Sequence, residues 1–114
     1  MKRSMDLTGP GVLLADMVDA TEKTITANWS ELKPFVELES KRILDSVSDI
    51  ARMKADGTIS ETQASLHMKI QLEAYVSLLL TIKGIRRVQA ENAVNAGISV
   101  IRSTVNRLLG WSLL

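Results

Sequence analysis

Apolar residues recur at spacings of three, four or seven positions along most of this 114-residue chain. Residues at these spacings share one face of an α-helix. The stripe before residue 55 comprises Leu14, Val18, Ile25, Trp29, Leu32, Val36, Ile43, Val47 and Ile50. Two later stripes comprise Met68, Leu72, Tyr75, Leu79 and Ile82, and then Val94, Ile98, Ile101, Val105 and Leu108. The sequence therefore predicts an all-α protein.

One cluster of turn residues interrupts this pattern in the interior of the chain. Asp56 and Gly57 provide a backbone position that tolerates positive φ, which is a natural stop for a helix. Ser60 and Gln63 have the spacing of a capping box, in which each side chain bonds to the backbone N–H of the other residue. We therefore expect a helix on either side of a short turn.

The expected fold is a long antiparallel helical hairpin, with helices over residues 11–54 and 61–109. Helices of roughly 65–75 Å are too long for a compact monomer of this size, so we expect hairpins to pack into a helical bundle as an oligomer. Pro34 and Gly84 are expected to kink the two helices. The alternative is a monomeric four-helix up-down bundle, cut at these two residues. We favour the hairpin because neither cut leaves residues for a loop.

The chain is expected to form a single helical domain over residues 1–114, with residues 1–10 and 110–114 as flexible tails. Residues 11–15 are too short an apolar core for a signal peptide. No stretch approaches the roughly 18 uninterrupted apolar residues of a membrane span. We therefore expect a cytoplasmic protein that does not cross a membrane.

The residue types that metal sites and catalysis require are scarce. The chain has no cysteine, and its one histidine, His67, has no carboxylate or second histidine three or four positions away. The turn after Asp56 is similar to half of a calcium loop, but Arg52 and Lys54 would occupy two of the ligand positions. We expect no metal, no cofactor, no catalytic residue and no enzymatic activity.

Charge is almost balanced, with 14 Lys and Arg against 13 Asp and Glu, for a net charge of +1. The tightest basic cluster is a candidate basic patch formed by Lys83, Arg86 and Arg87. Nucleic-acid binding needs cations along a face with few acids, and Glu91 and Glu31 fall nearby in the expected hairpin. A role as a nucleic-acid accessory protein is therefore only a second alternative.

The hairpin also predicts which charges face each other. If the chain turns near Gly57, Lys69 should lie near Asp45, and Glu73 should lie near Lys41. Exposed pairs of this kind contribute only about 0–1 kcal/mol each, so they bear on helix register more than on stability.

The most apolar segment is residues 74–82, in which seven of nine residues are apolar. Nine residues wind around a helix two and a half times, so one neighbouring helix covers only part of this segment. In the expected hairpin, residues 33–41 lie opposite and are also apolar beyond one stripe. We therefore predict an obligate homo-oligomer whose interface comprises Phe35, Val36, Leu38, Tyr75, Leu78, Leu79, Leu80 and Ile82.

These observations favour a self-associating helical protein that acts in assembly, scaffolding or adaptor binding. Its expected partner is a second copy of itself, with another protein as a further candidate. The alternative is a protein of a membrane surface or lipid granule, since long amphipathic helices also suit a lipid interface.

Overall fold

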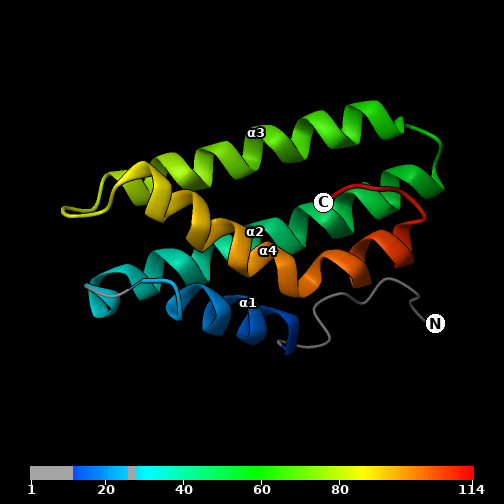
Figure 1. Ribbon diagram of the computed structural model, residues 1–114. Coiled ribbons are helices and arrows are strands. Elements are labelled where there is room, and N and C mark those ends of the chain that lie inside the picture. Colours follow the sequence, from blue (N-terminus) through cyan, green and yellow to red (C-terminus); the bar gives the residue numbers. More distant parts are fainter. Residues whose placement is uncertain (1–11, 26–27) are drawn as a thin grey trace.

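The computed structural model describes residues 12–25 and 28–114. The described residues form a bundle of four helices that alternate in direction (Figure 1). In chain order the helices are α1 (Val12–Glu22), α2 (Trp29–Ala55), α3 (Glu61–Leu80) and α4 (Arg87–Leu109). The prediction of an all-α bundle is confirmed.

The prediction of two long helices, kinked near Pro34 and Gly84, is wrong. One helix ends at Glu22 and the next begins at Trp29, and a second pair is separated between Leu80 and Arg87, so the molecule measures 43 × 26 × 19 Å. The four-helix alternative is closer, although its first cut was placed at Pro34, which lies inside α2. Proline there removes only the bond to the carbonyl of Ser30, one turn from the start of the helix, so α2 continues through it.

The apolar stripe continues through both connections, because the apolar side chains in them pack against the core. Ile25 is buried in the first connection, and Ile82 and Ile85 are half-buried in the second. Gly84 adopts a φ of 92°, which gives the second connection its turn. The side-chain amide of Asn28 donates a hydrogen bond to the carbonyl of Lys83 at 3.0 Å, so the two connections meet at one end of the bundle.

The predicted turn between α2 and α3 is confirmed. Gly57 has a φ of 72°. The Ser60 hydroxyl accepts from the Gln63 backbone N–H at 3.0 Å, and the Gln63 side chain accepts from the Ser60 backbone N–H at 2.9 Å. This capping box satisfies two of the backbone donors that the start of α3 leaves without a helical partner.

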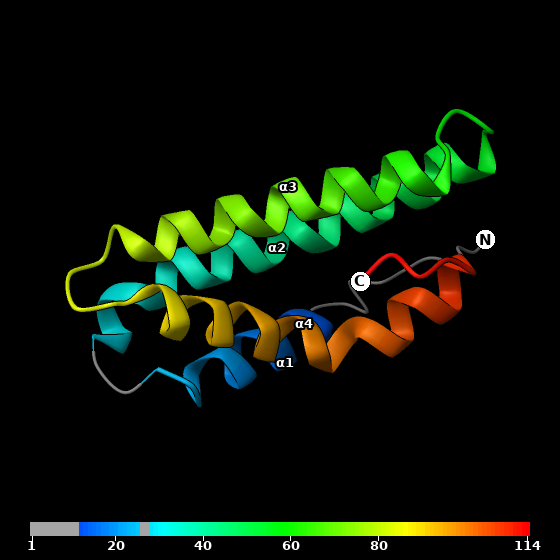
Figure 2. The ribbon, with the colours of Figure 1, turned by 45° about the horizontal axis from the view of Figure 1, so that its top comes forward.

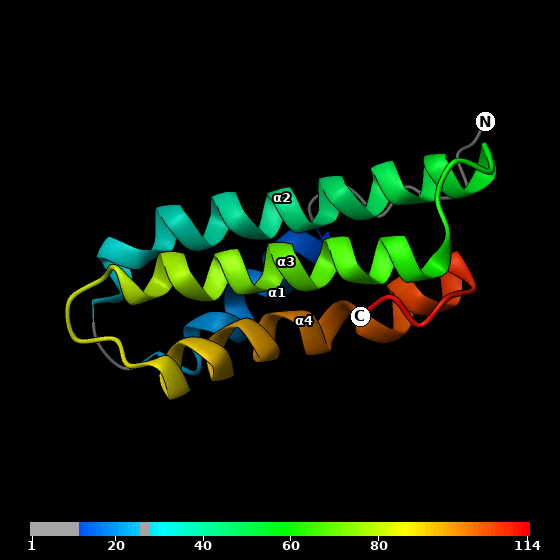
Figure 3. The same cartoon turned by 90° about the horizontal axis from the view of Figure 1, so that it is seen from above.

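The helices form two layers, with α2 beside α3 in one and α1 beside α4 in the other (Figures 2 and 3). Each helix contacts its neighbours around the bundle, and α1 packs against both α4 and α2. With 11 residues against 27 in α2, α1 covers only the part of the bundle nearest the two connections.

The segment after α4 packs against the bundle, contrary to the prediction of a flexible tail over 110–114. Leu113 is buried, and the Asn106 side chain accepts hydrogen bonds from the backbone N–H groups of Leu113 and Leu114, both at 2.9 Å. Lys54 donates to the carbonyl of Leu109 and lies 4.9 Å from the ring centre of Trp111. The other predicted tail, residues 1–10, lies outside the described residues.

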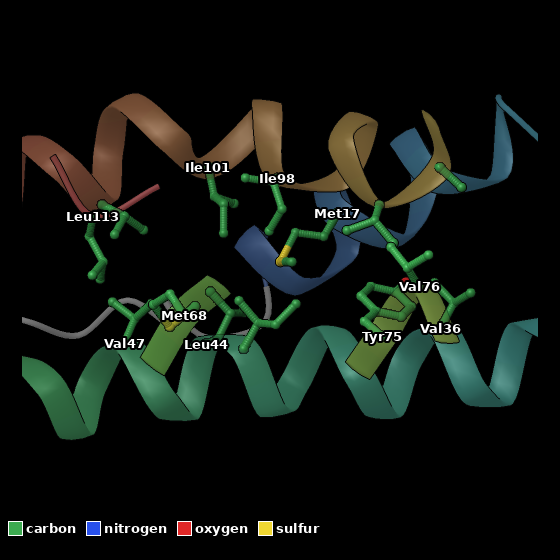
Figure 4. Close-up of a cluster of buried hydrophobic side chains, with 14 of the residues drawn as sticks. Met17, Val36, Leu44, Val47, Met68, Tyr75, Val76, Ile98, Ile101 and Leu113 are labelled. Carbon is green, nitrogen blue, oxygen red and sulfur yellow. The ribbon is translucent and has the colours of Figure 1, made fainter. Parts of the chain in front are cut away.

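Core side chains from all four helices meet along the axis of the bundle. Figure 4 shows the Met17 side chain of α1 reaching into the space between Ile98 of α4 and Leu44 of α2, with Leu113 above Val47 of α2. The α4 residues at the α1 seam are small and buried: Ala90, Ala93 and Gly97. These small residues let the backbones of α1 and α4 approach closely.

The predicted charge pairs between α2 and α3 do not form. Asp45 pairs with Lys41 of its own helix at 3.1 Å, and Glu73 pairs with Arg87 of α4 at 3.2 Å. Residues three or four apart on a helix are already neighbours, so the α2 charges find partners without reaching across to α3.

Candidate interaction surface

Three of the eight predicted interface residues belong to the chain's own core. Val36, Tyr75 and Leu79 are between 0% and 2% exposed. Leu78, Leu80 and Ile82 are half-buried, and Leu80 and Ile82 pack against the core. Val36, Tyr75 and Leu79 are therefore covered by the chain itself rather than by a second copy, contrary to the prediction, because a four-helix monomer supplies neighbours on more sides than a single hairpin does.

The other two predicted interface residues are exposed on α2. Phe35 is 40% exposed and Leu38 is 46% exposed. They lie three positions apart, and the buried residues Val36 and Glu39 follow each of them by one position. Leu38 therefore leaves α2 on the side away from the core, while Phe35, one turn from the buried Leu32 and Glu39, lies at the edge of the buried stripe.

Helix α3 carries a second exposed apolar pair that the sequence analysis missed. Leu66 is 58% exposed and Ile70 is 62% exposed, one helical turn apart. Both stand off the buried stripe of α3, which runs through Ala64, Met68 and Tyr75. That offset was visible in the sequence, but the interface prediction rested on local apolar density, which is highest after residue 74.

We name the surface formed by Phe35, Leu38, Leu66 and Ile70 the α2–α3 face. The two helices lie side by side in one layer (Figure 3). Leu38, Leu66 and Ile70 lie opposite the buried stripes of their own helices, and Phe35 lies at the edge of the α2 stripe. A few scattered exposed apolar residues are normal, whereas pairs one turn apart on two adjacent helices form a surface on which another apolar surface can pack.

Charged and polar side chains lie between and around the two apolar pairs. Arg42 pairs with the mostly buried Glu39 at 3.0 Å, and Lys41 pairs with Asp45 at 3.1 Å. His67 is exposed beside Leu66. This mixture of apolar pairs and polar surroundings is typical of an interface that also remains stable in water.

The predicted basic patch is exposed at the end of the bundle where the two connections meet. Lys83 and Arg86 lie in the second connection, and Arg87 begins α4. Arg87 bonds to the carboxylates of Glu73 at 3.2 Å and Glu91 at 3.3 Å, and the first of these bonds is the main reason that the pKa of Arg87 is raised. These bonds hold the Arg87 guanidinium against the α3–α4 surface.

A buried cluster of hydroxyl groups occupies the centre of the bundle, and no pattern in the sequence indicated it. Thr21, Ser40 and Tyr75 come from three helices and are at most 2% exposed. Thr21 donates to the carbonyl of Met17 at 2.8 Å, while the Ser40 and Tyr75 hydroxyls have no hydrogen-bond partner. Burial raises the pKa of Tyr75 to about 12, and the nearby hydroxyls of Ser40 and Thr21 oppose that shift.

The surface hollows are small and lie between neighbouring helices. One of about 380 Å³ lies between α1 and α2, where Leu14 and Val18 are flanked by Asp19 and Glu37. Among the described residues, no group of three or more His, Cys, Asp or Glu side chains is arranged to hold a metal ion. Over the same residues, no helix has the length and apolar character needed to span a membrane.

Comparisons of the chain with protein-family models, with curated proteins and with solved structures find no match.

Proposed function

We propose that the chain is a non-enzymatic, self-associating helical protein that acts in assembly, scaffolding or adaptor binding. The α2–α3 face is the surface through which two copies meet. The observation that carries this proposal is the pair of exposed residues Leu66 and Ile70, 58% and 62% exposed, in the same layer as Phe35 and Leu38.

The positions of the two apolar pairs suit a closed dimer. Leu38 lies toward the start of α2, and Ile70 lies in the first half of α3, which runs in the opposite direction. Their separation along the bundle is roughly 12 Å, from 1.5 Å of rise per residue. A two-fold axis that lies in the plane of the face, obliquely to the helices, therefore places Leu38 of each copy near Ile70 of the other. Such an interface is self-complementary, as a closed dimer requires.

The proposal is tested by sedimentation equilibrium on the full chain and on the Ile70→Glu variant. We expect the wild type to form a dimer at micromolar concentrations. Removing Ile70 and placing a charge in the interface should weaken that dimer at least about 100-fold, because a charged group buried without a partner loses its hydration. Helicity should not change, since Ile70 is 62% exposed in the monomer.

Val88→Glu is the matched control. Val88 is 68% exposed on α4, outside the α2–α3 face, so its replacement should leave association unchanged. A wild-type chain that stays monomeric at 100 µM would contradict the proposal. So would equal effects of Ile70→Glu and Val88→Glu. Flotation of such a monomer with anionic lipid vesicles, lost in Ile70→Glu, would instead assign the same face to a membrane surface.

A further inference from the structure

The hollow between α1 and α2 has an apolar floor and a charged rim. Its volume is about 380 Å³, within the range of about 300–1,000 Å³ that ligand sites occupy. Leu14, Ala15 and Val18 of α1 form the floor, and Leu14 and Val18 also pack against the core. The rim consists of exposed charged residues: Asp19, Glu22, Lys33 and Glu37.

The lining residues follow helical spacing on both helices. Leu14, Val18 and Glu22 are four positions apart along α1, and Lys33 and Glu37 are four positions apart along α2. Positions four apart share one face of a helix, so the hollow is a groove that runs between the two helices. We name it the α1–α2 groove. A third helix fits a groove of this kind, with its own apolar face against the floor.

The charge around the α1–α2 groove is negative, although the whole chain carries +1. Helix α1 contains Asp16, Asp19 and Glu22 and has no lysine or arginine. Three carboxylates line the groove against the single ammonium group of Lys33. Lys23 pairs with Asp19 at 3.3 Å, but both side chains are at least 65% exposed. Such a pair contributes little, so Asp19 is able to bond to a second cation.

We propose that the α1–α2 groove binds a basic amphipathic helix of a partner protein. Apolar side chains one turn apart on that helix pack against Leu14 and Val18. Its lysine and arginine side chains, on either side of the apolar stripe, bond to Asp19, Glu22 and Glu37. The negative rim steers a basic helix to the groove, and the apolar floor selects one whose apolar residues have helical spacing.

The α1–α2 groove and the α2–α3 face lie on different sides of α2. Glu37 lines the groove, whereas Leu38 of the α2–α3 face follows by one position, about 100° further around the helix. Helix α1 lies in the other layer (Figure 3). A dimer joined through the α2–α3 face therefore keeps the groove of each copy open and presents two partner sites. The groove itself does not depend on the dimer.

Charge reversal at the rim tests the proposal. The probe is a fluorescently labelled synthetic peptide of leucine, lysine and alanine, about four turns long, with its leucines three and four positions apart. Fluorescence anisotropy should show that it binds the full chain, whereas the same peptide with glutamate for every lysine should not bind. Glu37→Lys should weaken binding of the basic peptide at least about 10-fold, because an attraction becomes a repulsion.

Asp45→Lys is the matched control for Glu37→Lys. Asp45 is an exposed carboxylate on the same helix and does not line the groove, and its reversal changes the net charge by the same amount. It should change binding less than about 2-fold, because exposed charges farther apart than a Debye length are screened. Equal effects of the two variants, or no binding of the basic peptide to the wild type at 100 µM, would overturn the proposal.

Filling the floor tests the shape of the groove without changing its charge. Ala15 is exposed and lines the groove, so the phenyl ring of Ala15→Phe occupies the floor and should weaken binding at least about 10-fold. Ala55→Phe, at an exposed alanine of α2 outside the groove, should leave binding unchanged. Circular dichroism checks that each variant keeps its helices. Unchanged binding in Ala15→Phe would overturn the proposal.

The Ile70→Glu variant separates this proposal from that of the dimer. Ile70 belongs to the α2–α3 face and does not line the groove, so Ile70→Glu should bind the basic peptide as the wild type does. A monomeric wild type that binds the peptide would contradict the dimer and support the groove. Loss of peptide binding in Ile70→Glu would place the peptide on the α2–α3 face and overturn the groove.

Discussion

Gly97 lets α1 approach α4 closely because it has no Cβ atom. An added Cβ would lie 2.8 Å from Thr21 Oγ1, which is closer than such atoms approach in proteins. We expect Gly97→Ala to lower the free energy of unfolding by about 1–2 kcal/mol, because the strain exceeds the gain in helix propensity. In a Thr21→Ala background the same substitution should be neutral or stabilising. Urea unfolding of the four chains measures this coupling, and equal effects in both backgrounds would contradict it.

Tyr75 makes stability depend on alkaline pH. Its pKa is raised from 10.0 to about 12 in the folded protein, because burial disfavours the phenolate. The contribution to stability is fully present below pH 10 and is lost as the pH rises to 12, by about 2–3 kcal/mol in all. Tyr75→Phe should remove this loss. At pH 7 it should leave stability unchanged or slightly higher, since the hydroxyl has no hydrogen-bond partner. Urea unfolding of both chains at pH 7, 10 and 12 checks the sign; an equal fall for both would contradict it.

Among the elements, the segment after α4 has two of its backbone N–H groups bonded to a single side chain. Asn106 accepts both the Leu113 and the Leu114 backbone N–H groups, each at 2.9 Å. Asn106→Ala should leave these donors without a protein partner and lower stability by about 1–2 kcal/mol. It should also speed hydrogen exchange at residues 111–114. Asn92→Ala, at an exposed position of the same helix, is the control and should change neither quantity. Slow exchange at 111–114 in Asn106→Ala would contradict this, and would show that the buried Leu113 and the contacts with Lys54 and Glu61 fix the segment.

Elements with local signals could be predicted from the sequence, whereas the two other connections could not. Gly57 and the Ser60 capping box identify their turn, because these residue types at these positions are typical of a turn followed by the start of a helix. Ile25 and Ile82 carry the apolar stripe through residues 23–28 and 81–86, so these connections resemble helix in sequence. Pro34 misled the prediction because a proline near the start of a helix costs only one hydrogen bond. These errors concern where the chain bends, which depends on what the whole chain packs against.

At the scale of the whole molecule, packing of the whole chain also explains why most residues of the predicted interface are buried within one copy. Apolar density identified residues 74–82 as needing cover on several sides, and they do receive it, largely from the chain's own helices. Only Phe35 and Leu38 of the predicted set are exposed. Leu66 and Ile70 were missed because the interface prediction followed apolar density, although both stand off the predicted stripe through Met68 and Tyr75. The surface available to a partner is what remains after packing, and packing is not a local property of the sequence.

The overall dimensions separate the compact bundle from the long hairpin in solution. The described fold has a Cα radius of gyration of 14.2 Å and a longest dimension of 43 Å. A hairpin of helices roughly 70 Å long would have a radius of gyration of about 20 Å, because mass is spread along a rod. To keep the chain monomeric, the measurement uses the Ile70→Glu variant, which places a charge in the α2–α3 face. Small-angle X-ray scattering of this variant should give a radius near the smaller value. A radius near 20 Å at the mass of one chain would contradict the four-helix bundle, and with it the packing of α1 against Gly97 and the burial of Tyr75.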